Sequence, residues 1–345
     1  MGRRLICAPD FSEVDMKFLK SALPLLLIAF LLLCGCAPGE NAKSAVSTAN
    51  VKLGQGEFVY FFARTVDSTS ASGNKAPNSF KPLKDQLYDE GITWFDAMLS
   101  TTLDYVKQVI LLCEAACEAN VELTAEDGAD VAIADFKKQC EAKYGVSFEA
   151  YLEVSFHGYT DETAYANAVK LEMLAKKYMA ILREEIHGGI TDSRIAEYKA
   201  QNGIADDDTL TRNLMIIYLG KNGEARANTV VSALNESGIS EESFASLAKR
   251  HSDISEYLYE NCARGDMSAL VDSWLYADGR KAGDTGVLKD GDTAFVVYYY
   301  GEGKTVSDWE AALAIADADY RAALAALAEK FPITVNEDLL RSLDI

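Results

Sequence analysis

Histidine is scarce in this 345-residue sequence, which has only His157, His187 and His251, all far apart in the chain. The seven cysteines show neither the density of a small disulfide-stabilised domain nor the paired spacing of a zinc module. The sequence also lacks a P-loop, a metalloprotease HExxH motif and a dinucleotide-binding fingerprint. We therefore expect no metal and no cofactor, and little chemistry that depends on histidine.

Basic residues are also few, with 33 Lys and Arg against 53 Asp and Glu, for a net charge of −20. Such an acidic surface repels phosphate backbones, so we expect no nucleic-acid partner. Prolines number only six and 49% of the residues are hydrophobic, which excludes a collagen-like or wholly disordered chain. The length suits about two domains of ~100–200 residues each.

The sequence opens with a leader, residues 1–35. An apolar run at 21–35 (SALPLLLIAFLLLCG) follows Lys17 and Lys20, which is the layout of a secretory signal peptide. The run is shorter than the ~20 apolar residues of a membrane-spanning helix. A buried apolar helix is the alternative. Residues 1–15 do not fit a signal peptide, so we expect translation to start at Met16.

The apolar run ends in Leu33-Cys34-Gly35-Cys36, which resembles the lipobox of bacterial lipoproteins. In that family, the cysteine after a small residue is diacylated and becomes the first residue of the mature protein. Cys36 fits better than Cys34, because it follows Gly35. The resemblance implies an extracytoplasmic protein held to the membrane by lipid on Cys36. The small and polar residues that follow predict a flexible tether over 36–50.

Residues 51–206 are predicted to be mainly helical, with a polar loop at 67–82. Thr93 and Thr124 each precede an aspartate by three residues, which is typical of a helix start. A long helix is expected after Thr160, and a shorter one from Asp192 to a glycine cap at 203.

Three cysteines lie in this helical region. Cys113 and Cys117 are four residues apart on an apolar helical stripe, and Cys140 lies on the next helix. A zinc or redox site is one interpretation. The position on the stripe favours buried thiols, and the spacing suits a disulfide within one helix poorly.

The pattern changes at residue 207. Two runs, Leu214–Leu219 and Ala294–Tyr300, predict strands, and helices are expected at 225–234 and at 241–249 after Ser240. Consecutive residues His251, Ser252 and Asp253 cannot converge as a nucleophile triad, so we interpret them as a helix end. Helical character returns at Trp309–Phe331, with Ser307 and Glu310 as a further helix-start pattern.

The middle segment, residues 207–304, resembles a parvulin-type peptidyl-prolyl isomerase domain, and residues 85–345 together resemble foldases of the SurA/PrsA type. The most specific stretch is Tyr259–Gly286, with Gly-Asp-Met at 265–267 and a Lys-x-Gly-Asp turn at 281–284. The segments SLAKRHSD at 246–253 and FPITVNEDLL at 331–340 also match. The resemblance implies an α+β fold: a mainly helical chaperone region, 51–206 and 305–345, interrupted by a parvulin-like module with a short antiparallel sheet.

The resemblance also implies a cup for the proline ring. Met267 matches the family methionine, Val271 stands where phenylalanine is usual, and Tyr276 matches a second aromatic residue. The usual polar residues are replaced: Asn213 and Phe295 stand where strand histidines are expected, and Ile254 stands where the family has Cys or Asp. Ordinary core packing is the alternative role for Met267, Val271, Tyr276 and Phe295.

We therefore expect a lipid-anchored foldase or holdase that binds unfolded or newly translocated polypeptides, with a parvulin-like module that has lost isomerase activity. An active prolyl isomerase is one alternative. A solute-binding lipoprotein is another, although that class needs repeated strand–helix alternation that builds two α/β lobes.

Overall fold

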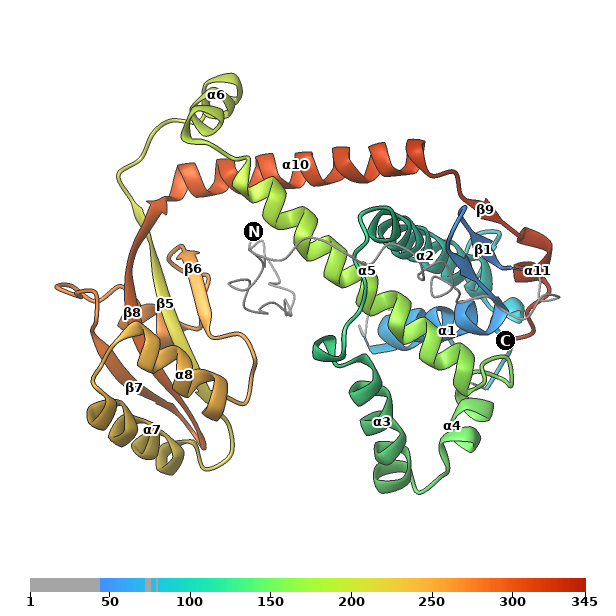
Figure 1. Ribbon diagram of the computed structural model, residues 1–345, viewed down its shortest axis with the longest axis horizontal. Coiled ribbons are helices and arrows are strands. Elements are labelled where there is room, and N and C mark those ends of the chain that lie inside the picture. The colour runs from blue at the N-terminus through green and yellow to red at the C-terminus, as the bar shows by residue number, and fades with distance from the viewer. Residues whose placement is uncertain (1–43, 72–75, 79) are drawn as a thin grey trace, which may run out of the picture. The chain divides into compact units, whose positions relative to one another are not determined.

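The computed structural model (Figure 1) describes residues 44–71, 76–78 and 80–345. The predicted leader, the Met16 start and Cys36 lie outside the described residues. Among the described residues, no helix combines the length and apolar character needed to cross a membrane. The fold class is α+β and mainly helical, as predicted.

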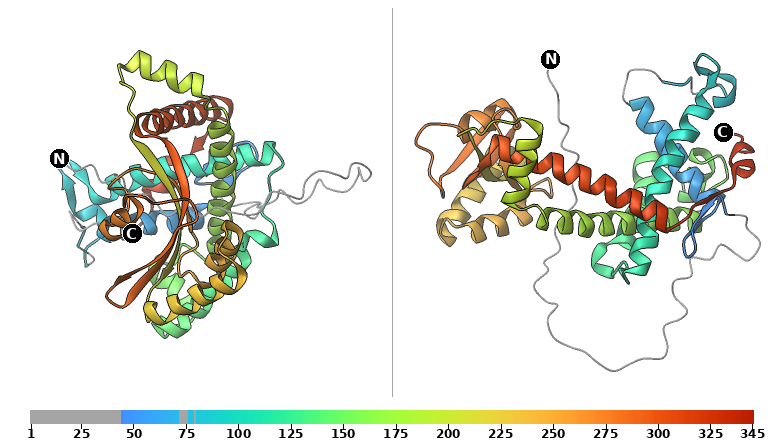
Figure 2. Two further views of the ribbon diagram at one scale, coloured as in Figure 1. Left: turned by 90° about the vertical axis from the view of Figure 1, so that its left-hand side faces the viewer. Right: turned by 90° about the horizontal axis from the view of Figure 1, so that it is seen from above.

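The described chain divides into two compact units. The helical unit comprises residues 44–187 and 318–345, and the sheet unit comprises residues 188–317. Helix α10 (Val306–Lys330) is continuous through the second boundary (Figure 2), so its first half belongs to the sheet unit and its second half to the helical unit.

The helical unit is built mainly from long amphipathic helices around one core. Besides the second half of α10, this unit contains β1 (Val46–Ser47), β2 (Lys52–Leu53), α1 (Gln55–Ala71), the 3-10 helix η1 (Leu83–Asp85), β3 (Leu87–Asp89), β4 (Ile92–Thr93), α2 (Trp94–Glu118), the 3-10 helix η2 (Ala125–Asp127), α3 (Ala129–Gln139), the π-helix η3 (Cys140–Tyr144), α4 (Phe148–Ser155), α5 (Glu162–Gly188), β9 (Thr334–Val335) and α11 (Glu337–Arg341).

Most helix starts in this unit follow the sequence pattern. Thr93 caps α2, because its hydroxyl accepts the N–H of Asp96 at 3.1 Å. Thr124 and Asp127 also form a capping box, but it opens only the short 3-10 helix η2. Helix α1 continues to Ala71, so the first residues of the loop predicted at 67–82 are helical.

The cysteines of the helical unit agree with the interpretation as thiols. Cys113 and Cys140 are fully buried and Cys117 is partly buried. The Cys113 thiol donates a hydrogen bond to the carbonyl of Leu171 at 3.2 Å. Within the described residues no group of metal-ligating side chains forms a site.

A carboxylate at the centre of the helical unit joins three helices. Glu172 of α5 pairs with Arg64 of α1 and accepts a hydrogen bond from the Tyr105 hydroxyl of α2 at 3.0 Å. Burial raises the pKa of Glu172, but the positive charges of Arg64 and Lys176 outweigh that effect, and the pKa is lowered. The network satisfies a charge that the core would otherwise disfavour.

The start of the described chain is folded, which corrects the prediction of a tether over residues 36–50. Val46 and Ser47 form β1, paired antiparallel with both β2 and β9, and the side chain of Val46 is fully buried. Asn50 donates from its side chain to buried Glu114 at 2.7 Å. The tether prediction is therefore wrong for residues 44–50, because these residues find partners far along the chain.

The sheet unit contains a four-stranded antiparallel sheet in the order β6-β5-β8-β7. Its elements are α6 (Asp192–Asn202), β5 (Leu210–Leu219), α7 (Gly223–Ser237), α8 (Glu241–His251), β6 (Leu258–Cys262), α9 (Ala269–Leu275), β7 (Thr285–Asp290), β8 (Thr293–Thr305) and the first half of α10. The predicted strands and helices of this region are confirmed, including the Ser240 cap of α8 and the left-handed Gly203 that ends α6.

Strand alternation gives this sheet two different faces. Met215, Ile217 and Leu219 of β5 pack against α7 and α8 in one cluster. Figure 1 shows these two helices next to the sheet. Leu214 and Ile216 belong to a separate cluster with α9 on the opposite face. All strand pairs in the described residues are antiparallel, so the two α/β lobes of a solute-binding protein are not seen there.

Helix α6 belongs to the sheet unit because it packs on the start of α10. Ile195 is buried against Ala311, Ala312 and Ile315. The predicted domain boundaries at 206/207 and 304/305 therefore lie inside this compact unit.

The first turn of α10 differs from the predicted capping box. Thr305 provides the cap, because its hydroxyl accepts the N–H of Asp308 at 3.2 Å. Ser307 is buried and accepts a hydrogen bond from the Lys199 ammonium of α6 at 2.9 Å. The predicted pair of Ser307 and Glu310 is wrong, because the neighbouring helix recruits the serine.

Glu114 provides a test of how the first described residues are held. Its carboxylate also accepts the backbone N–H groups of Asn50 and Val51, both at 3.1 Å, and the Thr48 hydroxyl at 2.7 Å. We expect Glu114→Ala to lower the free energy of unfolding by about 2–4 kcal/mol, since several buried donors lose their acceptor. Urea unfolding and hydrogen exchange at the Val51 amide would measure this.

The matched control is Glu118→Ala, one helical turn further along. Glu118 pairs with Lys330, and both side chains are about half exposed, so its loss should cost no more than about 1 kcal/mol. Equal losses of stability in the two variants would contradict the proposed role of Glu114.

Candidate functional site

The candidate site lies on the face of the sheet that α7 and α8 leave uncovered. One apolar cluster, here called the aromatic cluster, occupies this face and the adjoining α9. Its buried members are Leu214, Ile216, Cys262, Val271, Leu275, Val297 and Tyr299, and its partly buried members are Tyr259, Met267, Trp274, Tyr276, Leu288 and Phe295.

Four residues of the predicted cup lie in this cluster. Val271 is buried, whereas Met267, Tyr276 and Phe295 keep part of their surface accessible. The Tyr276 ring is fixed in place because its hydroxyl donates to the Cys262 carbonyl at 2.7 Å. Burial raises the pKa of Tyr276 to about 12, against the lowering effect of nearby Arg212.

The other two predicted residues lie elsewhere. Asn213 pairs with Gly301, whereas Phe295 pairs with Tyr218, so five ladder positions, or roughly 17 Å, separate them along the strands. Asn213 lies at a β-bulge, where its side-chain oxygen accepts the Asn261 N–H at 2.6 Å. Ile254 is 41% exposed in the loop after α8 and outside the cluster. The structure therefore does not bring Asn213 and Ile254 to the cup.

Arg212 is a member of this site that the sequence analysis missed. Its guanidinium lies 4.8 Å from the ring centre of Tyr276 and 5.6 Å from that of Tyr299, and it donates to the Leu275 carbonyl. Arg212 has the same strand parity as Leu214 and Ile216, so alternation along β5 was the signal that could have located it on this face.

Trp274 closes another side of the cluster. The Arg280 guanidinium stacks 4.0 Å from the centre of the Trp274 ring and donates to the Trp274 carbonyl at 2.8 Å. Gly286 of β7 lies against the ring, because a Cβ atom there would be only 2.5 Å from the indole nitrogen. The absence of a side chain at 286 therefore allows the indole to pack directly on the sheet.

The segment His251-Ser252-Asp253 is structural, as the sequence indicates. Helix α8 ends at His251, and the Ser252 hydroxyl accepts the Tyr218 N–H at 3.2 Å. Asp253 accepts hydrogen bonds from Arg226 at 2.6 and 2.7 Å and from the Gly220 N–H at 2.7 Å. These contacts tie the end of α8 to the end of β5.

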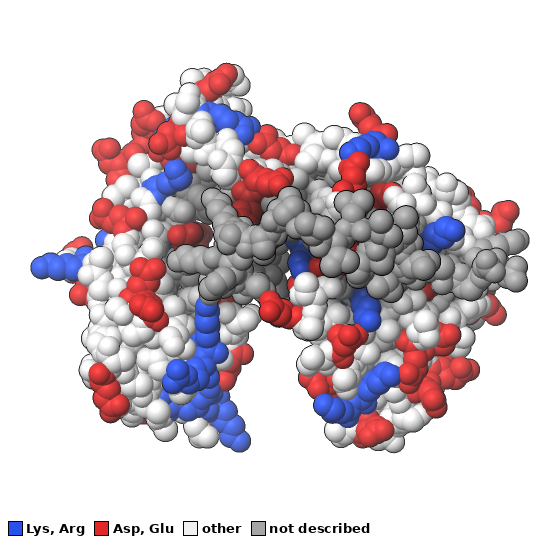
Figure 3. Space-filling view, in the orientation of Figure 1, with Lys and Arg blue, Asp and Glu red and all other residues white. Residues whose placement is uncertain are grey.

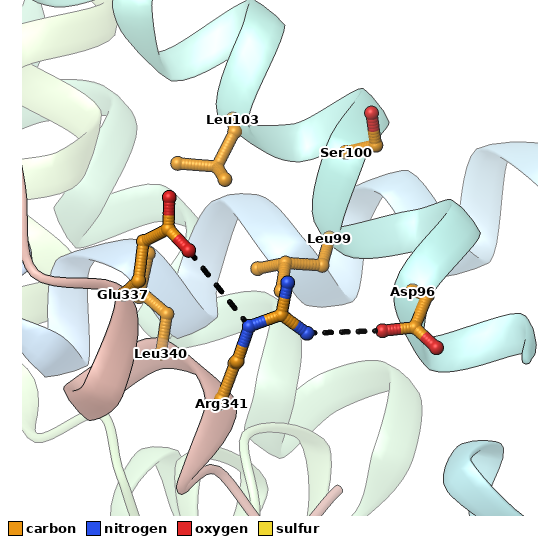
Figure 4. Close-up of a pocket in the computed structure, with 7 residues that line it drawn as sticks. All are labelled: Asp96, Leu99, Ser100, Leu103, Glu337, Leu340 and Arg341. Atoms are coloured by element: carbon orange, nitrogen blue, oxygen red, sulfur yellow. Dashed lines mark hydrogen bonds and ion pairs between the residues drawn. The ribbon is translucent and has the colours of Figure 1, made fainter.

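Two small pockets lie in the helical unit. The first, about 140 Å³ in volume, lies between α2 and α11 (Figure 4). Arg341 crosses it, 3.4 Å from an oxygen of Asp96 and 3.9 Å from one of Glu337, so its guanidinium is paired with two carboxylates. The second, about 290 Å³, is lined by residues that include Glu114 and Phe331. Small-molecule sites usually measure ~300–1,000 Å³, so the first pocket is well below this range and the second lies at its lower limit.

The helical unit instead exposes large apolar side chains. Leu87 on the β3–β4 hairpin is 69% exposed, and Val131 on α3 and Val154 on α4 are 61% and 78% exposed. Tyr144 and Val146 lie between α3 and α4 and are also exposed. Acidic side chains are spread over the visible face of the molecule (Figure 3). Apolar groups exposed in this way can bind other polypeptides.

Comparison with solved structures finds matches that include PrsA foldases and SurA-like chaperones. No protein-family model matches the chain, and no curated protein matches it. PrsA from Bacillus subtilis matches at 15% identity over 76% of this chain and 94% of that chain, with a TM-score of 0.37. The foldase PrsA from Lactococcus lactis matches at 12% identity over 86% and 96%, with a TM-score of 0.27.

A third match comes from a structural study of the Campylobacter jejuni proteins PEB4 and Cj1289, described as SurA-like chaperones. The identity is 10% over 84% of this chain and 98% of that chain, with a TM-score of 0.24. The structural neighbours are PrsA foldases and SurA-like chaperones. The resemblance expected from the sequence agrees with these neighbours.

Gly286 gives a direct test of the packing around Trp274. We expect Gly286→Ala to lower the free energy of unfolding by about 1–3 kcal/mol, because the new methyl group displaces the indole. Tryptophan fluorescence should shift in the same variant. The control is Gly188→Ala, where a Cβ atom meets no neighbour within 4 Å. Unchanged stability and fluorescence in Gly286→Ala would disprove this packing.

Asp253 gives a test of pH dependence. Hydrogen bonds from Arg226 and from the Gly220 N–H lower its pKa from 3.8 to about 2. A lowered pKa in the folded state stabilises the fold above the unfolded value, and that contribution is lost as the pH falls from about 4 to about 2. We expect an NMR titration of the Asp253 carboxyl to have its midpoint near 2, and Arg226→Gln to return it towards 4. A midpoint near 4 in the unmutated protein would disprove the pairing.

Proposed function

We propose that this chain is an extracytoplasmic, lipid-anchored protein-folding factor that binds non-native polypeptides, and that its parvulin-like module, residues 207–304, has lost prolyl isomerase activity. The observation that carries the proposal is the composition of the aromatic cluster. It offers a partly accessible apolar surface around Met267, Tyr276 and Phe295, but strands β5 and β8 contain no histidine.

The loss of activity follows from what the reaction needs. Rotation about a prolyl bond is slow because the amide resists leaving planarity. An apolar surface can hold a proline ring, but polar groups must weaken the resonance of the bond. Asn213 is the polar replacement at a family histidine position, and its side chain is engaged by Asn261 and Glu302 at the bulge. Its position favours a structural role.

Binding of non-native chains is supported by the exposed apolar side chains of the helical unit. Leu87, Val131 and Val154 are each more than 60% exposed. Unfolded polypeptides expose apolar segments that could dock on such residues, and hydrophobic contact requires neither a cofactor nor a nucleotide. The lipid anchor on Cys36 remains part of the proposal, and it would keep the protein at the membrane where translocated chains emerge.

The holdase activity can be tested by light scattering from thermally unfolded citrate synthase. We expect the full chain, kept in mild detergent, to suppress aggregation at near-stoichiometric ratios. The double variant Val131→Ser/Val154→Ser should weaken suppression at least about twofold, because it removes exposed apolar area. The control is Gln139→Ser/Glu149→Ser, which changes exposed polar residues on or next to the same helices. Unchanged suppression by the valine variant would contradict the role of these helices.

A protease-coupled assay on a prolyl tetrapeptide tests the second part of the proposal. We expect the rate of cis-to-trans conversion to equal the uncatalysed rate. An acceleration that Met267→Ala abolishes would show an active isomerase and overturn the proposal for this module.

A further inference from the structure

Two arginines flank one end of the aromatic cluster. The Arg212 guanidinium lies 4.8 Å from the centre of the Tyr276 ring, and the Arg264 guanidinium lies 4.7 Å from the same centre. Arg212 comes from the start of β5, and Arg264 comes from the loop between β6 and α9. Elements distant in sequence thus place two positive charges around one aromatic ring.

Neither guanidinium has a carboxylate within 4.0 Å among the residues that the structure describes. Two carboxylates interact electrostatically with the hydroxyl groups of these tyrosines: Asp272 with that of Tyr276, and Glu302 with that of Tyr299. Asp272 instead accepts the Gly265 N–H at 2.9 Å. In a chain with 53 acidic and 33 basic residues, two adjacent arginines without an acidic partner are unexpected.

Other arginines of the same unit do have partners. Arg226 pairs with Asp253 at 2.6 Å, and Arg280 pairs with Asp284 at 3.4 Å. Arg226 holds the loop that follows α8, and Arg280 packs on the Trp274 ring, so both charges stabilise the local structure. Arg212 and Arg264 are held by aromatic faces, which orient a guanidinium but leave its charge without a counterion.

The positions of Arg212 and Arg264 also favour the binding of an anion. Arg212 is partly buried and uses one nitrogen on the Leu275 carbonyl, and a guanidinium has five N–H donors. Arg264 is exposed. A partly desolvated guanidinium attracts a carboxylate more strongly than one in bulk water. The apolar neighbours Met267 and Tyr276 would contact the residue next to that carboxylate.

We propose that Arg212 and Arg264 bind a carboxylate of a client peptide whose neighbouring apolar or prolyl residue packs on Met267 and Tyr276. The carboxylate is supplied by an Asp or Glu side chain or by a chain end. This inference rests on the proposed function, because it assigns the aromatic cluster a client segment of defined chemistry: apolar with an adjacent negative charge.

Fluorescence anisotropy with labelled peptides tests the proposal on the full chain in mild detergent. Two amidated peptides have the same apolar, proline-containing sequence, with Glu or Gln before the proline. A third has the Gln sequence with a free carboxyl end directly after the proline. We expect the Glu peptide to bind roughly tenfold more tightly than the Gln peptide, the effect of one charge-assisted contact. Raising the salt from about 0.05 M to about 0.5 M should reduce that ratio. The third peptide separates the two sources of the carboxylate.

Variants identify the residues responsible. Arg264→Gln should lower the ratio between Glu and Gln peptides at least about threefold, and the Arg212→Gln/Arg264→Gln double variant should bring it to about one. Arg212→Lys should keep part of the preference, because it keeps the charge. The control Arg250→Gln removes an exposed charge on α8 and should leave the ratio unchanged. Circular dichroism melting checks each variant, and Arg264→Gln is decisive if Arg212 variants unfold, because Arg264 is exposed.

The outcomes separate this inference from the proposed function. Equal binding of all three peptides by the unmutated protein would overturn the carboxylate site and leave client binding intact. An absence of binding by every peptide would overturn both the site and client binding by the sheet unit, whereas the aggregation assay would still report on the helical unit. A preference for Glu that survives the double variant would also overturn the assignment to these arginines.

Discussion

Alternation along β5 and β8 is the constraint on which the sheet unit depends. Successive side chains of a strand point to opposite faces, so the apolar residues along these two strands alternate between the helix-covered core and the aromatic cluster. Met215 and Val296 lie in the first, and Leu214 and Val297 lie in the second. A shift of one residue in either strand would exchange the residues of the two clusters. Burying a polar side chain in either cluster would therefore cost free energy unless it found a hydrogen-bond partner.

That cost explains the chemistry of the aromatic cluster. The face is built mainly from aliphatic and aromatic residues, and Arg212 lies beside it near the start of β5. A guanidinium can lie beside Tyr276 because aromatic faces stabilise it and Leu275 accepts one hydrogen bond. The result is a mainly apolar and aromatic surface with one guanidinium beside it.

In the helical unit, whose helices pack around one apolar core, the pairing of buried charge is an additional constraint. Glu172 connects three helices, and Glu114 holds the first described residues through several donors. The core itself is a separate apolar cluster, and the exposed apolar side chains Leu87, Val131 and Val154 lie outside it on the β3–β4 hairpin, α3 and α4. The buried carboxylates that connect the elements and the apolar side chains that are exposed are thus different residues.

The sequence by itself determined the local structure. Helix caps at Thr93, Ser240 and Gly203, the two main strands and the shortage of histidine all follow from neighbouring residues or from composition. Only the tertiary structure decided the partners: Asn213 lies at a bulge, Ser307 faces Lys199, and Val46 and Ser47 join a sheet. These outcomes depend on strand register and on contacts between segments far apart in the chain, which a local pattern does not encode.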